Sequence, residues 1–199
     1  MERDQLKSIL ESLLFASEGP VRVHRLGEVL EGVERSEISS VLQELQAEYD
    51  GSGRGFRLAE VAGGHQMQTA RENADWVKKL YRDRPLRMSR ATLETLAIVA
   101  YKQPITRAEI EAIRGVDVDG VVATLLDRRL IRIVARKDVP GRPFLYGTTP
   151  EFLQLFNLKD LSHLPTLKEM EEMTLPEQKQ ESETQPAPPE ETPPESSEQ

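Results

Sequence analysis

The chain has 199 residues, a formal net charge of −8 and 38% apolar residues, and it contains no cysteine. This length permits one or two small domains. The missing cysteine excludes a disulfide framework and a thiolate metal site. Since there is no apolar run of membrane-spanning length and no signal-peptide core, we expect a cytoplasmic protein without a membrane segment.

The first predicted helix carries a broad apolar stripe. Its leucines and isoleucine recur at helical spacing, and the stripe is wider than a small three-helix core consumes. We therefore predict a homodimer that is joined through this helix. The candidate interface residues are Leu6, Ile9, Leu10 and Leu13, and Leu14 belongs to the same stripe.

A hairpin and a connecting helix are predicted to complete the first half. Residues 54–61 and 65–69 form the two strands, with Ala62-Gly63-Gly64 between them. A helix from about residue 72 to residue 82 follows. We expect its Trp76 to be a packing anchor rather than a platform for a ligand.

Clear helix signals mark the start of the second half. One apolar stripe indicates a helix that ends before Pro104. Thr106 and Glu109 have the spacing of a capping box for a second helix. Gly115 is placed to end that helix in the left-handed conformation. A third helix is predicted from about residue 118.

Two strands are predicted after these helices. Residues 130–136 alternate enough for a half-buried strand, and residues 144–148 form its partner. Val139-Pro140-Gly141 between them has the residues of a reverse turn. Helix, helix, helix, strand, turn, strand is the order of a winged helix.

The first half repeats the apolar pattern of the second. A shift of 84 residues superposes the two patterns through both turns without a gap, which indicates two copies of one unit. Three of the matched pairs are Pro20 with Pro104, Leu26 with Ile110, and Ile38 with Val122. We therefore predict an α+β, mainly helical protein of two tandem winged-helix domains, residues 1–84 and 85–168, and a tail, residues 169–199.

The predicted tail accounts for the acidity of the chain. From Glu169 onward there are ten acidic residues, one lysine and no aromatic residue. Such a segment cannot bury enough surface to offset its ordering entropy, so we expect it to be disordered. The remaining chain is close to neutral.

No catalytic constellation is present in the sequence. His24, His65 and His163 are scattered without metal-ligand spacing. The glycine-rich run at 51–55 lacks the Gly-Lys-Ser/Thr ending of a phosphate-binding loop. We expect no enzyme activity, no cofactor and no metal.

Winged helices often bind DNA through the third helix, but here the exposed faces of both predicted third helices carry carboxylates, which phosphate repels. A basic cluster lies instead on the second hairpin and the turn before it. It indicates a solvated face, the rim of a site for an acidic partner, or a weak nonspecific DNA contact. Its members are Arg128, Arg129, Arg132, Arg136, Lys137 and Arg142.

Several runs of the second half resemble the family of segregation and condensation protein B, ScpB. They read LETLAIVAY from residue 93, QPITR from residue 103, RKDVPGRP from residue 136 and LYGTT from residue 145. The resemblance extends from about residue 4 to Leu167. Together these runs are highly specific, although a helix–turn–helix alone is a common motif.

The resemblance implies a homodimer that binds the kleisin ScpA and, through ScpA, the SMC ATPase, in a complex that condenses and segregates the bacterial chromosome. It places the protein on the nucleoid. We expect the ScpA surface on the second domain, because a loop with two prolines is pre-ordered and because Arg and Tyr often anchor interfaces. The alternatives are a winged-helix transcription regulator and an adaptor unrelated to chromosomes. The candidate ScpA-binding residues are Tyr101, Arg136, Lys137, Pro140, Arg142 and Tyr146.

Overall fold

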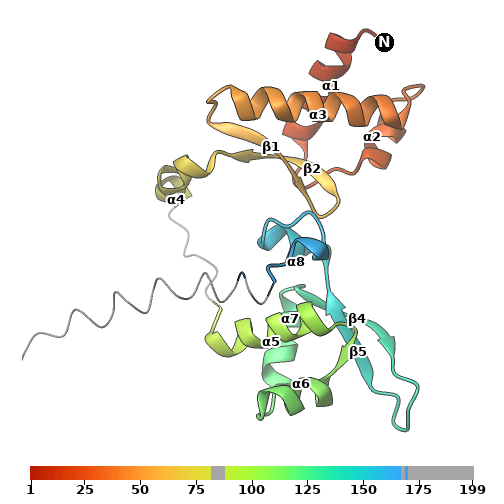
Figure 1. The fold of residues 1–199 in the computed structure, drawn as a ribbon, viewed down its shortest axis with the longest axis vertical. Coiled ribbons are helices and arrows are strands. Elements are labelled where there is room, and N and C mark those ends of the chain that lie inside the picture. Colours follow the sequence, from red (N-terminus) through yellow and green to blue (C-terminus); the bar gives the residue numbers. More distant parts are fainter. Residues whose placement is uncertain (82–87, 167–168, 170–199) are drawn as a thin grey trace, which may run out of the picture. The chain divides into compact units, whose positions relative to one another are not determined.

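The computed structural model describes residues 1–81, 88–166 and 169 and shows a mixed α/β, mainly helical chain (Figure 1). It divides into two units, Met1–His163 and Leu164–Gln199, and the elements below belong to the first. The domain boundary expected at residues 84 and 85 lies outside the described residues, and so does the expected tail, residues 169–199, apart from Glu169. Both stay predictions.

The first half contains three helices and a two-stranded hairpin. The hairpin is antiparallel, and its two central turn residues, Ala62 and Gly63, both have positive φ, at 52° and 70°. This turn type matches the right-handed twist of paired strands. The elements are α1 (Arg3–Ala16), α2 (Val23–Val29), α3 (Arg35–Gly51), β1 (Phe56–Val61) and β2 (Gly64–Thr69).

The core of the first half forms where the apolar stripe of α1 meets α3. Leu6 and Leu10 of α1 and Ile38 and Leu42 of α3 are fully buried. Burial of side chains of this size contributes about 1.5–3 kcal/mol each. The predicted apolar stripe of α1 is therefore buried mainly in the core of the first half.

A contact that the sequence did not predict joins the loop before α2 to the hairpin. The backbone groups of Val21 and His65 exchange two hydrogen bonds of 2.9 Å. A Cβ atom on the neighbouring Gly64 would lie 2.9 Å from the carbonyl of Val21. Only glycine fits there without displacing the backbone.

The connecting helix differs from the prediction in its packing. A short 3₁₀ turn, η1 (Arg71–Asn73), precedes α4 (Ala74–Tyr81). Trp76 is 71% exposed and Lys79 stacks over its ring at 4.6 Å. The expectation of a packing anchor is therefore wrong for the described residues, because no core surface covers the ring.

The helix signals of the second half are confirmed. Ser89 caps α5 by accepting a hydrogen bond from the Thr92 N–H. Thr106 and Glu109 form the complete capping box of α6, and Gly115 ends it at φ 70°. The helices are α5 (Arg90–Lys102), α6 (Arg107–Arg114), α7 (Asp119–Asp127) and α8 (Pro150–Leu155), with a 3₁₀ turn η2 (Leu161–His163).

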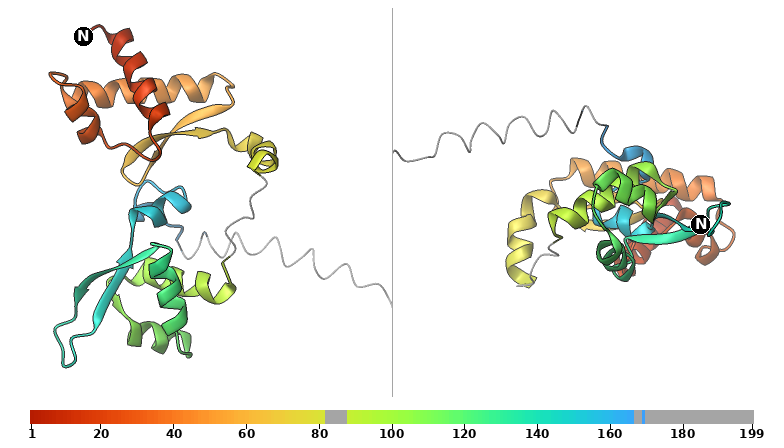
Figure 2. Two further views of the ribbon diagram at one scale, coloured as in Figure 1. Left: turned by 180° about the vertical axis from the view of Figure 1, so that it is seen from behind. Right: turned by 90° about the horizontal axis from the view of Figure 1, so that it is seen from below.

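The second sheet has three strands in the order β3-β5-β4. The two long strands are β4 (Ile131–Arg136) and β5 (Phe144–Thr148), and their hairpin extends beyond α5, α6 and α7 (Figures 1 and 2). The sequence did not predict β3 (Ile105–Thr106), which pairs with β5. Ile105 pairs with Tyr146, and Ile105 is the residue that the 84-residue shift matches to Val21. Both halves thus contain the same additional backbone pairing.

The side chain of Gln103 joins the end of α5 to β5. Its Oε1 accepts from the Thr148 N–H at 2.8 Å, and its Nε2 donates to the Ala100 carbonyl and the Thr148 hydroxyl at 3.0 Å. Thr148 is buried. The amide therefore satisfies a buried backbone donor that the sheet leaves unpaired.

The loop after α8 contacts the first hairpin. The N–H groups of Ala62 and Gly63 donate to the carbonyls of Leu158 and Lys159 at 2.9 Å. Lys159 also pairs with Glu60 at 2.9 Å.

Candidate partner-binding surfaces

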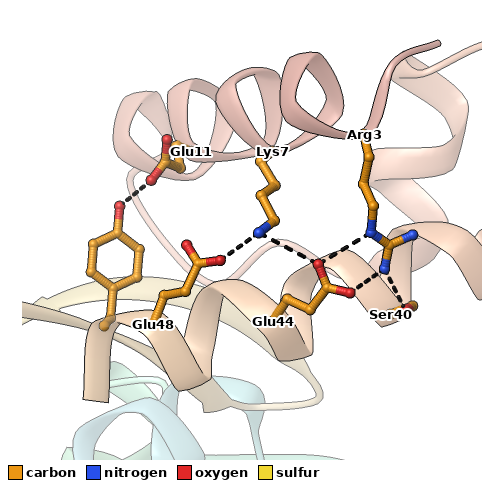
Figure 3. A network of polar contacts seen from close by, with 7 residues as sticks. Arg3, Lys7, Glu11, Ser40, Glu44 and Glu48 are labelled. Atoms are coloured by element: carbon orange, nitrogen blue, oxygen red, sulfur yellow. Dashed lines mark hydrogen bonds and ion pairs between the residues drawn. The ribbon is translucent and has the colours of Figure 1, made fainter. Parts of the chain in front are cut away.

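The carboxylates of α3 bind α1, as Figure 3 shows. Arg3 donates to Glu44 and, at 3.0 Å, to the hydroxyl of Ser40. Lys7 contacts Glu48 and also Glu44. The hydrogen bond from Arg3 lowers the pKa of Glu44. Part of the acidic face predicted on this third helix is thus a surface for α1.

A fifth contact joins the same two helices. The Tyr49 hydroxyl donates to the carboxylate of Glu11 (Figure 3). Burial, together with this hydrogen bond, raises the pKa of Tyr49 to about 12. The raised pKa keeps the phenol protonated, and therefore a donor, even near pH 10, where an ordinary tyrosine loses its proton.

The predicted dimer residues fall into two groups. Leu6 and Leu10 are fully buried in the core and offer no surface to a partner, so their assignment to the interface is corrected. Ile9 and Leu13 pack against the edge of the core and keep part of their surface. Phe15 at the end of α1 is 83% exposed and was missed, although its position near the stripe was visible in the sequence.

The loop of the second hairpin has the predicted reverse turn. The Arg142 N–H donates to the Val139 carbonyl at 2.9 Å, with Pro140 and Gly141 between them. Gly141 has φ 82°, which this turn type requires at its third residue. The turn therefore has the backbone geometry that Pro140 and Gly141 predict.

Four of the six predicted ScpA-binding residues lie on this hairpin with exposed or half-buried side chains. Arg136, Pro140 and Arg142 are exposed. Lys137 donates to Glu109 of α6 at 2.6 Å, so it fastens the hairpin to the helix. This ammonium and the donors of Thr106 lower the pKa of Glu109 to about 2.

The two predicted tyrosines lie in different environments. Tyr146 is 8% exposed and its backbone pairs with Ile105 and Ile133, so it belongs to the core, which corrects its assignment to the surface. Tyr101 at the end of α5 is exposed.

The hairpin exposes apolar residues that the sequence analysis missed. Only Ile131 of β4 is buried, which corrects the expectation of a half-buried strand. Ile133 is 46% exposed and Phe144 39% exposed, and the guanidinium of Arg136 stacks over the Phe144 ring at 4.2 Å. The unbroken run of apolar and basic residues in this segment was the available signal.

The exposed face of α7 is acidic. Asp119 pairs with Arg107, and Asp127 is exposed at the other end of the helix. The hydrogen bond that Arg107 donates to the Asp119 carboxylate raises the pKa of Arg107. A third helix with this charge repels the phosphates of a DNA groove.

Two further observations concern the described residues alone. In residues 1–81, 88–166 and 169, no three His, Cys, Asp or Glu side chains are grouped closely enough to hold a metal ion. None of the helices in the same part of the chain is long and apolar enough to cross a bilayer.

The fold defines a class of protein in which each half has three helices and a β-hairpin, and apolar side chains are exposed on the first helix and the second hairpin. The family model "Segregation and condensation complex subunit ScpB" matches residues 8–167. The chain belongs to this family.

Individual relatives agree with the family match. Segregation and condensation protein B of Syntrophotalea carbinolica is 54% identical over 174 residues, 87% of this chain and 88% of the relative. That of Moorella thermoacetica is 50% identical over 167 residues, 84% of this chain and 85% of the relative.

Two solved structures are also similar in sequence. ScpB from Mycobacterium tuberculosis is 38% identical and covers 79% of this chain and 98% of its own, with a TM-score of 0.40. A dimer of the ScpB N-terminal domain complexed with a ScpA peptide is 35% identical and covers 39% of this chain and 95% of its own, with a TM-score of 0.36. The family assignment rests on the sequence matches.

Proposed function

We propose that the protein is a non-catalytic subunit of the SMC–ScpA–ScpB complex that binds the kleisin ScpA as a homodimer and acts on the nucleoid in chromosome segregation. The observation that carries this proposal is the family match across residues 8–167. The ScpA peptide held by a related N-terminal domain dimer supports the choice of partner.

We also propose that each half is a winged-helix domain. The order of three helices and a hairpin in each half supports this assignment. The additional backbone pairing in each half, Val21 with His65 and Ile105 with Tyr146, supports it further.

The dimer contact is assigned to the exposed side of α1. Ile9 and Leu13 keep part of their surface, and Phe15 adds an exposed ring near them in the sequence. Large apolar side chains that remain uncovered in one chain are often covered by a partner. Sedimentation of the full chain tests this assignment, because Phe15→Ser is expected to shift a dimer toward monomer. A monomeric wild-type chain at micromolar concentration would contradict it.

A surface for ScpA is assigned to the second hairpin, around Arg136, Pro140 and Arg142. The pre-ordered turn lowers the entropic cost of binding. Exposed arginines form charge-assisted hydrogen bonds with carboxylates. Lys137 is not part of this surface, because its ammonium donates a hydrogen bond to Glu109.

The experiment is co-purification of the tagged chain with ScpA and SMC, followed by calorimetric titration of ScpA. Combining Arg136→Glu with Arg142→Glu reverses two exposed charges and is expected to weaken ScpA binding by more than about tenfold. The matched control combines Arg54→Glu with Arg71→Glu, two exposed arginines of the first half. If ScpA fails to co-purify with the wild-type chain while an operator DNA does, the protein is a transcription regulator and the proposal is wrong.

A further inference from the structure

One face of the second hairpin combines apolar, aromatic and cationic groups. Paired residues of neighbouring strands point to the same side of a sheet. Ile133 pairs with Tyr146, and Arg136 pairs with Phe144. Because residues 144 and 146 are two apart in β5, all four side chains share one face.

A β-bulge creates this combination. The pairing shifts by one residue between Ile133 and Ala135, at Val134. Without the bulge, residues 133 and 136 would point to opposite faces, because the side chains of a strand alternate. The bulge therefore places the Arg136 guanidinium on the same side as Ile133.

The inner part of this face is covered by the helices, and its outer part is not. Tyr146 is buried, whereas Ile133 and Phe144 are 46% and 39% exposed. The guanidinium of Arg136 lies over the Phe144 ring at 4.2 Å, and its Nη1 donates to the Arg142 carbonyl at 3.4 Å. A guanidinium has five N–H donors, so one that lies over an aromatic ring can still donate to a carboxylate.

We propose that this face, formed by Ile133, Arg136 and Phe144, binds an extended protein segment in which carboxylate side chains alternate with apolar ones. The apolar side chains of the segment pack on Ile133 and Phe144, and a carboxylate accepts from Arg136. The inference deepens the proposed function and rests on it, since the segment is assigned to ScpA.

Charge favours an acidic segment. Residues 128–144 contain six basic residues and one acidic residue, Asp138. These basic residues would attract a DNA duplex as well, but its phosphates make no favourable contact with the apolar side chains of Ile133 and Phe144. An acidic and apolar peptide therefore fits better than DNA.

The segment is expected to lie on the face rather than to extend the sheet. β4 is an edge strand, with β5 beside it. Bulges and charged side chains are features that prevent edge strands from pairing with further strands. The bulge at Val134 and the exposed Arg132 and Arg136 therefore disfavour strand addition.

The test measures binding of a fluorescent peptide of about ten residues, with Glu and Leu alternating, to the full chain by anisotropy. Arg136→Gln and Phe144→Ala are each expected to weaken binding about tenfold, as loss of an interface anchor does. A peptide with Ser in place of Leu is expected to bind about tenfold more weakly to the wild-type chain.

The matched control is Arg54→Gln. Arg54 also stacks over an aromatic ring, that of Tyr49 at 5.4 Å, but in the first half of the chain. This variant is expected to bind the peptide as the wild-type chain does. Circular dichroism establishes whether each variant is folded. If Phe144→Ala is unfolded, the comparison of Arg136→Gln with the wild-type chain decides the test.

Three results would overturn the inference. They are no binding of the Glu-Leu peptide, equal binding by Arg136→Gln, and tighter binding of a short duplex DNA than of the peptide. Co-purification of ScpA with the wild-type chain is measured separately. If ScpA co-purifies and the peptide does not bind, the inference fails while the proposed function stands.

Discussion

Replacing Gln103 by alanine removes the side chain that joins α5 to β5. The substitution deletes the acceptor of the Thr148 N–H at 2.8 Å and the donors to the Ala100 carbonyl and the Thr148 hydroxyl at 3.0 Å. Thr148 is 9% exposed, so water reaches its backbone poorly. The main consequence is a buried N–H group without a partner.

The magnitude follows from this unpaired donor. A buried donor that loses its acceptor costs about 1–3 kcal/mol, and each lost hydrogen bond costs about 0.5–1.5 kcal/mol. We expect Gln103→Ala to lower the free energy of unfolding by about 2–4 kcal/mol. For a chain of this size, 1 kcal/mol shifts Tm by about 2–4 °C.

The assay is urea unfolding followed by circular dichroism, with the slope of the transition compared between variants. The control is Gln43→Ala, which removes an exposed glutamine from α3 and is expected to change stability by less than about 0.5 kcal/mol. If Gln103→Ala is no less stable than this control, the Thr148 N–H does not depend on Gln103 and the reasoning is refuted.

Three further outcomes are expected. Burial lowers the pKa of His65 from 6.5, so below that pH this residue binds more protons in the unfolded chain than in the folded one. The contribution of His65 to stability is therefore complete above pH 6.5 and is lost as the pH falls, and in thermal unfolding His65→Gln is expected to reduce this pH dependence. Gly64→Ala forces a Cβ atom to 2.9 Å from the Val21 carbonyl and is expected to cost about 1–3 kcal/mol in the same urea assay, whereas an unchanged midpoint would mean that the loop moves freely. Truncation after Leu167 is expected to leave Tm within a few degrees, and a larger loss would show that the acidic tail contributes to stability.

The sequence alone was sufficient for features that depend on neighbouring residues. The capping box of Thr106 and Glu109, the left-handed Gly115 and the turn around Pro140 all formed as expected. Each depends on hydrogen bonds or backbone angles within a few residues, so the local sequence specifies it. The repeated apolar pattern also predicted that Leu26 and Ile110 are both buried.

Only the tertiary structure decided which predicted surface residues are available to a partner. Leu6 belongs to the same stripe as the partly exposed Leu13, and Tyr146 is of the same residue type as the exposed Tyr101. Packing against distant elements nevertheless buries Leu6 and Tyr146. Lys137, which was predicted to bind a partner, instead donates a hydrogen bond to Glu109, 28 residues away in the chain. Periodicity identifies an apolar face but not what covers it, because the covering element comes from another part of the chain.

The same reason explains the two backbone pairings that the sequence did not predict. Val21 with His65 and Ile105 with Tyr146 each join residues about 40 positions apart. A strand of one or two residues carries no periodicity of its own. Its formation depends on the helices that bring the loop beside the hairpin, and that is a property of the folded chain.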